Sequence, residues 1–308
     1  MSAPAPADLA VDIGGTTIAV GLVDAAGTLV HTAVRPTPHG DAETVWAQVA
    51  ALIAETVRTA GGRVRAAGVV SAGPIERDAG TVSPINIAAW RSFPLRARVQ
   101  AALPGVAVHL GGDGTAMALG ESWRGAGRGV PSMLGMVVST GVGGGLILDG
   151  APYPGRTGNA GHVGHVVVDP AGAPCHCGGR GCVETVAAAP ALVGWARSNG
   201  WTGSDAKTLA AAAAAGDPVA TAAFARGAAA LAAMIASVAA TCDLDLVVVG
   251  GGVSRAGAVL FDPLRAALAD HTGLAFLRGL RVVPAALGAD AGLVGAAALT
   301  RPHGPRFG

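Results

Sequence analysis

Short apolar runs separated by glycine-rich turns fill the first part of the chain. Runs at residues 9–13 and 18–23 flank the segment Gly-Gly-Thr-Thr, and a third run at 29–34 follows another turn. This pattern predicts an antiparallel meander whose first hairpin is rich in glycine. Apolar residues at helical spacing then predict a helix over 41–59 with Asp41 as its N-cap. A Pro/Ala tail of about seven residues precedes the first run and is expected to be disordered.

The opening pattern returns about 127 residues further along. A strand at 133–139, a tight loop at 141–145 and a returning strand at 146–148 repeat the earlier layout, which indicates two related halves. Further strands are predicted at 66–71, 106–110, 246–249 and 280–284. Helices are predicted at 115–123, through most of 184–242, at 259–270 and, built from small residues that allow tight packing, at 290–299.

Strand meanders that alternate with helices predict an α/β protein of two lobes. We expect an N-terminal lobe of residues 1–115 and a C-terminal lobe of residues 116–289. The C-terminal helix within residues 290–308 is expected to pack back on the first lobe.

Composition narrows the class of protein. Of the 308 residues, 51% are hydrophobic and 13% charged, which provides a large core and argues against disorder. The net charge of +1 argues against a nucleic-acid-binding surface or a polybasic membrane face. The most apolar stretch, 132–148, contains five glycines and makes a poor spanning helix. Without a leader pattern at the start, we expect a cytoplasmic protein with no membrane or nucleic-acid partner.

Two glycine-rich loops at matching places in the two halves are candidates for phosphate binding. Glycines let backbone N–H groups approach a phosphate, threonine hydroxyls add donors, and the aspartate could hold Mg²⁺ or a bound water. Each loop alone could be an ordinary turn, but the matching positions favour a nucleotide between them. Neither a P-loop nor a dinucleotide-binding spacing is present. The candidates are Asp12, Gly14, Gly15, Thr16 and Thr17 in the first loop and Thr140, Gly141, Gly143 and Gly144 in the second.

A cluster of cysteines indicates a metal site. Cys175, Cys177 and Cys182 lie within eight residues of one another, and His165 precedes them. Three thiolates and an imidazole make a closed tetrahedral set, which is typical of structural zinc. The alternatives are reduced cysteines without a metal, or a fourth ligand other than His165, namely His162 or His176.

Two acids and an amide are candidates for sugar chemistry. Asp113 stands between glycines where a strand ends and a helix begins, so it could take a proton from a substrate hydroxyl or serve as a helix N-cap. Glu184 follows Cys182 and could, with His165, bind a polyol, or it could be a solvated charge at a helix start. Asn86 could contact a sugar or belong to a turn.

Together these motifs resemble the ROK family (repressors, open reading frames and kinases), over residues 9–299. The most specific part is Ala-Gly-His-Val-Gly-His at 160–165 with the downstream cysteines and Glu184. The resemblance implies an actin-like ATPase (ribonuclease H-like) fold, ATP and Mg²⁺ as cofactors, structural Zn²⁺, and a homodimer.

The resemblance also implies roles for single residues. Asp113 falls on the base that deprotonates a sugar 6-hydroxyl, and the segment 247–252, with Gly250 and Gly251, falls on the adenosine side. Asn86, His162, His165 and Glu184 fall at the sugar. His165, Cys175, Cys177 and Cys182 fall on the zinc ligands.

Three positions depart from the usual family pattern. Thr17 replaces a lysine, Gly112 replaces an asparagine, and His162 replaces a glutamate that many members, including the glucokinases, carry. A histidine at that place resembles the N-acetylmannosamine kinases, so we expect phosphorylation of N-acetylmannosamine, with glucose as the alternative. A sugar sensor without activity is the alternative from another class. A DNA-binding repressor is disfavoured because the first phosphate loop already begins at Asp12.

Overall fold

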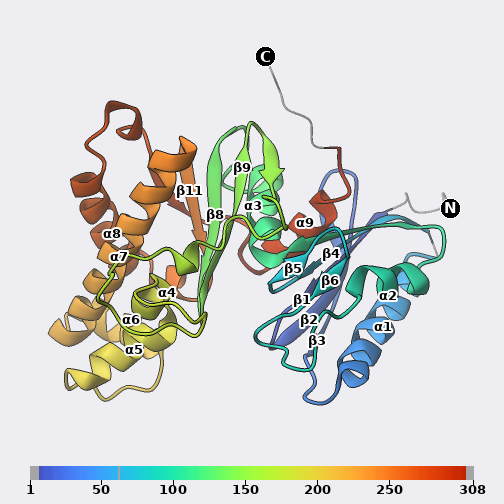
Figure 1. Ribbon diagram of the computed structural model, residues 1–308, viewed down its shortest axis with the longest axis horizontal. Coiled ribbons are helices and arrows are strands. Elements are labelled where there is room, and N and C mark those ends of the chain that lie inside the picture. Colours follow the sequence, from blue (N-terminus) through green and yellow to red (C-terminus); the bar gives the residue numbers. More distant parts are fainter. Residues whose placement is uncertain (1–6, 62, 303–308) are drawn as a thin grey trace.

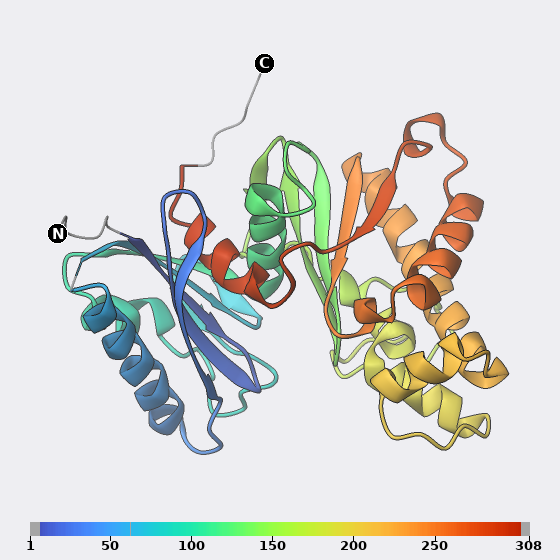
Figure 2. The same ribbon diagram turned by 180° about the vertical axis from the view of Figure 1, so that it is seen from behind.

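Two five-stranded sheets with the same internal order form the two lobes of the molecule (Figures 1 and 2). The computed structural model describes residues 7–61 and 63–302 of the chain. In order across the sheet, the first lobe contains β3 (Leu29–Pro36), β2 (Thr17–Val23), β1 (Ala7–Ile13), β4 (Val64–Ser71) and β7 (Ala107–Gly112). The second contains β10 (Ala151–Tyr153), β9 (Val142–Leu148), β8 (Met133–Val138), β11 (Leu246–Gly250) and β12 (Arg281–Pro284).

Strand pairing repeats between the sheets as well. β1 pairs antiparallel with β2 and parallel with β4, and β8 pairs antiparallel with β9 and parallel with β11. Each meander therefore supplies three strands, and the two parallel strands that follow are reached through helical crossovers. The predicted duplication is confirmed.

The first lobe buries its core between the sheet and two helices. In α1 (Ala42–Thr59), the Asp41 side chain accepts the Thr44 N–H, so the predicted N-cap is confirmed. The apolar face of α1 contributes Val49 and Leu52 to the core. The remaining elements are α2 (Leu95–Ala102) and a small hairpin of β5 (Ile75–Glu76) and β6 (Thr81–Val82).

Helices make up the outer part of the second lobe. They are α4 (Glu184–Ala187), α5 (Ala189–Ser198), α6 (Ala206–Ala214), α7 (Pro218–Cys242) and α8 (Ala258–His271). Short 3₁₀ turns lie at Val163–His165, Val253–Ala256, Ala275–Leu277 and Gly288–Asp290. Among the described helices, α7 alone is long and apolar enough to span a membrane, but 56% of its apolar window is buried inside the protein. It contacts α4, α5, α6 and α8, which is typical of a core helix.

Two helices cross between the sheets, α3 (Asp113–Arg124) and α9 (Ala291–Ala298) (Figure 2). Helix α3 contacts β8 and β9, whereas α9 contacts β1 and β4, and the two helices pack against each other. The close packing of α9 against α3 and β4 depends on glycines, which have no side chain at the contact. A Cβ on Gly295 would lie 1.7 Å from the Ala116 carbonyl oxygen, and one on Gly68 would lie 1.7 Å from that of Ala296. The lobe boundaries themselves stay a prediction.

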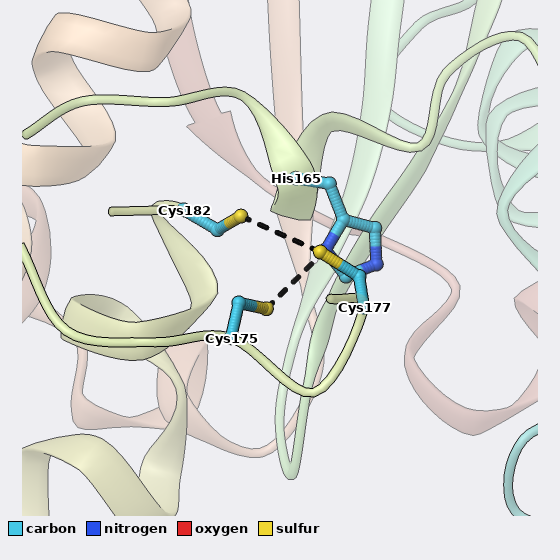
Figure 3. A group of neighbouring side chains, drawn as sticks. All are labelled: His165, Cys175, Cys177 and Cys182. Carbon is cyan, nitrogen blue, oxygen red and sulfur yellow. Dashed lines mark hydrogen bonds between the residues drawn. The ribbon is translucent and has the colours of Figure 1, made fainter. Parts of the chain in front are cut away.

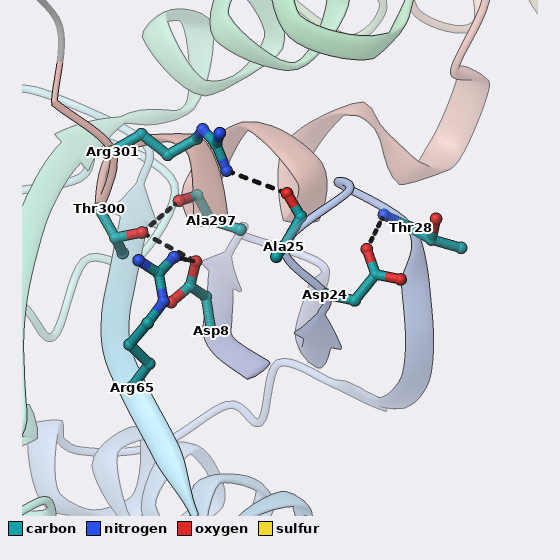
Figure 4. Close-up of polar contacts among 8 residues, drawn as sticks. All are labelled: Asp8, Asp24, Ala25, Thr28, Arg65, Ala297, Thr300 and Arg301. Atoms are coloured by element: carbon teal, nitrogen blue, oxygen red, sulfur yellow. Dashed lines mark hydrogen bonds and ion pairs between the residues drawn. The ribbon is translucent and has the colours of Figure 1, made fainter. Parts of the chain in front are cut away.

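The segment after α9 is tied to the first lobe by polar contacts (Figure 4). Thr300 donates a hydrogen bond of 3.0 Å to the buried carboxylate of Asp8, which also pairs with Arg65. Arg301 donates to the Ala25 carbonyl oxygen and lies over the ring of Trp123. These contacts anchor the C-terminal end of the helix that crosses the lobes.

Some predicted boundaries were wrong. β9 begins at Val142, so residues 142–145 are strand and only the short turn before them is loop. Helix α3 begins at Asp113 and not at Thr115. Residues 1–6 of the Pro/Ala tail lie outside the described residues, while Ala7 already belongs to β1.

Candidate functional site

Both lobes contribute to one cleft with a volume of about 860 Å³. Its walls are formed by the ends of β1, β8 and β11 and by the first turns of α3 and α9. The carboxyl ends of parallel strands and the start of a helix thus meet there, which is the usual place for a ligand in an α/β fold. Among the predicted site residues, the walls include Asp12, Asn86, Asp113, Thr140, Gly141, Gly143, His162, His165, Glu184, Gly250 and Gly251.

The rest of the first loop does not line the cleft. The Gly14 N–H donates to the Thr17 carbonyl oxygen, and Thr16 and Thr17 are exposed. Gly15 backs onto Asn86, because a Cβ on Gly15 would lie 2.6 Å from the Asn86 Cγ. The first loop therefore packs against Asn86, which lines the cleft, while Gly14, Gly15, Thr16 and Thr17 do not line it.

Gly144 is also outside the cleft walls. It lies in β9, and a Cβ on Gly114 would fall 2.3 Å from the Gly144 carbonyl oxygen. The glycine at 114 therefore lets the first turn of α3 pack directly on the strand. A Cβ on Gly144 itself would lie 2.8 Å from the Gly135 carbonyl oxygen, so packing also explains the glycine at 144.

Two acids share the floor of the cleft. Burial, followed by the negative charge of Asp113, raises the pKa of Asp12 from 3.8 to about 7. Asp113 is open to the cleft, but the surrounding walls displace bulk water, and this desolvation raises its pKa as well. The Gly114 N–H, 2.7 Å from Oδ1, and His162 oppose that rise.

The N-cap interpretation of Asp113 is wrong. The N-cap of α3 is Gly112, without a side-chain cap bond, and Asp113 is the first helical residue. Its carboxylate accepts the Gly114 N–H of its own helix and also lines the cleft. A carboxyl group with a raised pKa is suited to accept a proton from a hydroxyl group.

Glu184 and His162 are both held by backbone groups. Glu184 Oε2 accepts the Val142 N–H at 2.8 Å, which ties it to the first residue of β9. His162 Nδ1 lies 3.0 Å from the Asn159 carbonyl oxygen, so Nδ1 carries the proton and Nε2 is free for a ligand. Asn159, which the sequence analysis missed, also bonds the Ile75 backbone through both ends of its amide and so joins the lobes.

The four predicted metal ligands converge (Figure 3). His165 Nδ1 lies 3.7 Å from the Cys175 Sγ, the Cys177 and Cys182 sulfurs lie 3.8 Å apart, and all four ligand atoms lie within 4.8 Å of one another. A tetrahedral zinc with Zn–S bonds of about 2.3 Å would separate its ligands by about 3.8 Å. Neither His162 nor His176 belongs to this group. The donor set and its spacing therefore fit zinc.

His165 can serve two sites at once. Its Nδ1 faces Cys175, while the residue also lines the cleft. Glu184 begins α4 only two residues after Cys182, whose carbonyl oxygen accepts the Thr185 hydroxyl. A metal held by these ligands would fix the loop from which both His165 and Glu184 reach the cleft.

Comparison with known proteins identifies the family of this chain. The profile of the ROK family matches residues 8–303. This chain belongs to the ROK family. A glucokinase of Thermotoga maritima is 37% identical over 310 aligned residues, covering 95% of this chain and 96% of that protein. An N-acetylmannosamine kinase of Citrobacter koseri is 35% identical over 302, covering 95% and 98%.

A solved ROK family glucokinase from Streptomyces griseus, in complex with glucose and AMPPNP, superimposes with a TM-score of 0.82. The identity is 35%, and the match covers 95% of this chain and 98% of that one. The actin-like ATPase fold predicted from the resemblance is confirmed, and the chain is an ATP-dependent sugar kinase of the ROK family.

The sequence also missed part of the cleft wall of this ROK kinase. Met117, Ser139, His176 and Arg255 line it, together with backbone from 284 to 292. Arg255 follows the glycines after β11 and is the only arginine or lysine among the described residues of the wall. Its signal in the sequence is a cation three residues after the predicted adenosine-side segment 247–252.

Proposed function

We propose that this ROK kinase transfers the γ-phosphoryl group of ATP to the 6-hydroxyl of a hexose or N-acylhexosamine, with N-acetylmannosamine as the first candidate. The observation that carries the proposal is Asp113, a carboxyl group of raised pKa between glycine-rich strand ends and the loop that presents Glu184. A base at that place would lie between the bound nucleotide and the bound sugar.

Asp113 would act as the general base. It accepts the proton of the sugar 6-hydroxyl while that oxygen forms a bond to the γ-phosphorus and the bond to the β,γ-bridging oxygen breaks. Asp12 would hold a hydrated Mg²⁺, which offsets the phosphate charge when bound. Both carboxylates must be ionised for these roles.

On the nucleotide side, backbone groups would bind the phosphates and the adenosine. Thr140 and Gly141 belong to the turn before β9, and Gly250 and Gly251 follow β11. Gly251 has φ +92°, and a Cβ there would lie 2.4 Å from the Val138 carbonyl oxygen, so the turn needs glycine. Closure of the lobes would bring the first loop, with Gly14, Gly15, Thr16 and Thr17, onto the phosphates.

On the sugar side, Asn86, His162, His165 and Glu184 would bind hydroxyl groups. Zinc held by His165, Cys175, Cys177 and Cys182 would order the loop and take no part in the chemistry. We further propose that the enzyme acts in the cytoplasm as a homodimer.

His162 is the reason to place N-acetylmannosamine first. A glutamate would make two hydrogen bonds with sugar hydroxyls, whereas the Nε2 of His162 makes one. This smaller demand for hydroxyl partners suits a sugar with an acetamido group. Glucose is the second candidate, because a relative 37% identical and the solved structure with bound glucose are both glucokinases.

A substrate panel tests the sugar. We would compare kcat/KM for N-acetylmannosamine, glucose, mannose and N-acetylglucosamine with zinc-loaded protein, and identify the phosphorylated position by NMR. A preference of about tenfold or more for N-acetylmannosamine supports the first candidate, and the same preference for glucose replaces it. Phosphorylation at any position other than O6 would contradict the proposed reaction.

A further inference from the structure

Glu121 is a buried carboxylate that the proposed chemistry does not use. Its exposed fraction is 0%, and it lies near the end of α3, the helix that begins with Asp113. At 1.5 Å per residue, the two acids are about 12 Å apart along the helix axis. None of the ion pairs among the described residues involves Glu121, so this buried carboxylate requires another source of stabilisation.

Three backbone N–H groups supply that stabilisation. Oε2 accepts from Ala126 at 2.8 Å and from Ala286 at 3.1 Å, and Oε1 accepts from Leu287 at 2.8 Å. All three partners are N–H donors, and an ionised carboxylate has only acceptor atoms. Each of the three donors is therefore satisfied by a carboxylate oxygen. Two of the three belong to the connection between β12 and α9.

That connection is a wall of the cleft. Pro284 and Ala285 before the two bonded residues line the cleft, and so do Gly288 and Ala289 after them. The Ala285 N–H also bonds the Val249 carbonyl oxygen, which places the wall beside the glycines that follow β11. Glu121 therefore holds the middle of this wall segment through two hydrogen bonds, on the proposed adenosine side of the cleft.

Gly125 makes room for the Glu121 carboxylate. A Cβ on Gly125 would lie 1.9 Å from Glu121 Oε2, so only glycine at 125 lets the carboxylate reach its three donors. Gly125 has φ −109° and ψ −146°, outside the usual β range, and its Cβ would also lie 2.9 Å from the Glu121 Cα. The backbone and the carboxylate therefore both favour glycine at this position.

We propose that Glu121 is a positioning residue for ATP. Through its hydrogen bonds it connects α3, which begins with Asp113, to the segment between β12 and α9, where the adenosine would bind. It thereby positions the nucleotide relative to Asp113. This inference rests on the proposed placement of ATP at that wall.

The test uses two independent variants. Glu121→Gln keeps the size of the side chain but places an amide donor against one of the three N–H groups. Gly125→Ala leaves Glu121 in the chain and displaces its carboxylate. Leu52→Ala, in the core of the first lobe and away from the cleft, is the control for general loss of stability.

We expect Glu121→Gln and Gly125→Ala to raise KM for ATP and the Kd of ADP by about tenfold, the effect of one lost charge-assisted hydrogen bond. KM for the sugar should stay within about twofold and kcat at saturating ATP within about threefold. Leu52→Ala should lower the Tm and leave both KM values unchanged. A folded Glu121→Gln or Gly125→Ala protein with wild-type KM for ATP overturns the inference, as does an equal rise in both KM values.

A direct measurement of ADP binding distinguishes a failure of this inference from a failure of the proposed function. If wild-type protein phosphorylates none of the sugars, the proposed reaction fails, and calorimetric ADP affinity of the variants still decides the role of Glu121. If wild type is active and ADP affinity is unchanged in both variants, the role of Glu121 fails alone.

Discussion

Asp12 should make the ligand-free enzyme less stable as the pH rises, and Asp12→Asn should remove this penalty. The pKa of Asp12 is raised from 3.8 to about 7, chiefly by burial and then by the charge of Asp113. The folded state therefore holds the Asp12 proton more tightly than the unfolded state does. The cost is absent below the unfolded pKa, grows between the two pKa values and is complete above the folded one.

The magnitude follows from the shift. About three pKa units, at 1.36 kcal/mol each, give a penalty of about 4 kcal/mol above the folded pKa. Water in the cleft makes this an upper bound. Between about pH 5.5 and about pH 8.5, the stability advantage of Asp12→Asn should grow by about 2 kcal/mol.

The assay is urea unfolding of both proteins across this pH range, without Mg²⁺ or nucleotide. Asp78→Asn, in an exposed turn, controls for the loss of one carboxylate. Asp12→Asn should be the more stable protein at high pH and should also lose activity, because the carboxylate is proposed to hold Mg²⁺. A free-energy difference that does not change with pH, or an advantage for wild type at high pH, would refute the reasoning.

Further perturbations address other parts of the structure. Cys182→Ser should abolish stoichiometric zinc, measured by metal analysis, and raise KM for the sugar by about tenfold or more while ADP affinity holds, because the loop carries Glu184 and His165. The raised pKa values of Asp12 and Asp113, which must both be ionised, should place the acid limb of kcat/KM above the usual carboxyl range, with activity lost as the pH falls. His162→Gln should move the contribution of Asp113 to higher pH, because His162 lowers the pKa of Asp113. Gly295→Ala should destabilise the protein by about 1–3 kcal/mol in urea unfolding, since its Cβ would meet the Ala116 carbonyl oxygen.

The sequence predicted strands and helices well where the apolar pattern is regular. The helix at α1 has both a periodic apolar face and a capping residue, and both are present in the structure. The glycines at 143–145 were assigned to a loop because they carry no side-chain pattern. They are strand residues, and tertiary packing explains two of the three glycines: a Cβ on Gly145 would lie 2.5 Å from the Thr115 Cα, and one on Gly144 would lie 2.8 Å from the Gly135 carbonyl oxygen.

Candidate site residues were predictable where the ligand chemistry is local in sequence. The cysteine spacing and His165 identified a cluster that the structure brings together. Glu121 gave no such signal, because its three donors include two that lie about 165 residues away in the chain. Asn159 was missed for the same reason, as its partner Ile75 belongs to the other lobe.

The most direct test of the account is ADP release with ATP, Mg²⁺ and the preferred sugar, compared between wild type and Asp113→Asn. The substitution preserves the size of the side chain and removes the proton acceptor. We expect kcat to fall by about 10²–10⁴-fold while ADP and sugar still bind. An Asp113→Asn enzyme that turns over at the wild-type rate would contradict the assignment of Asp113 as the base.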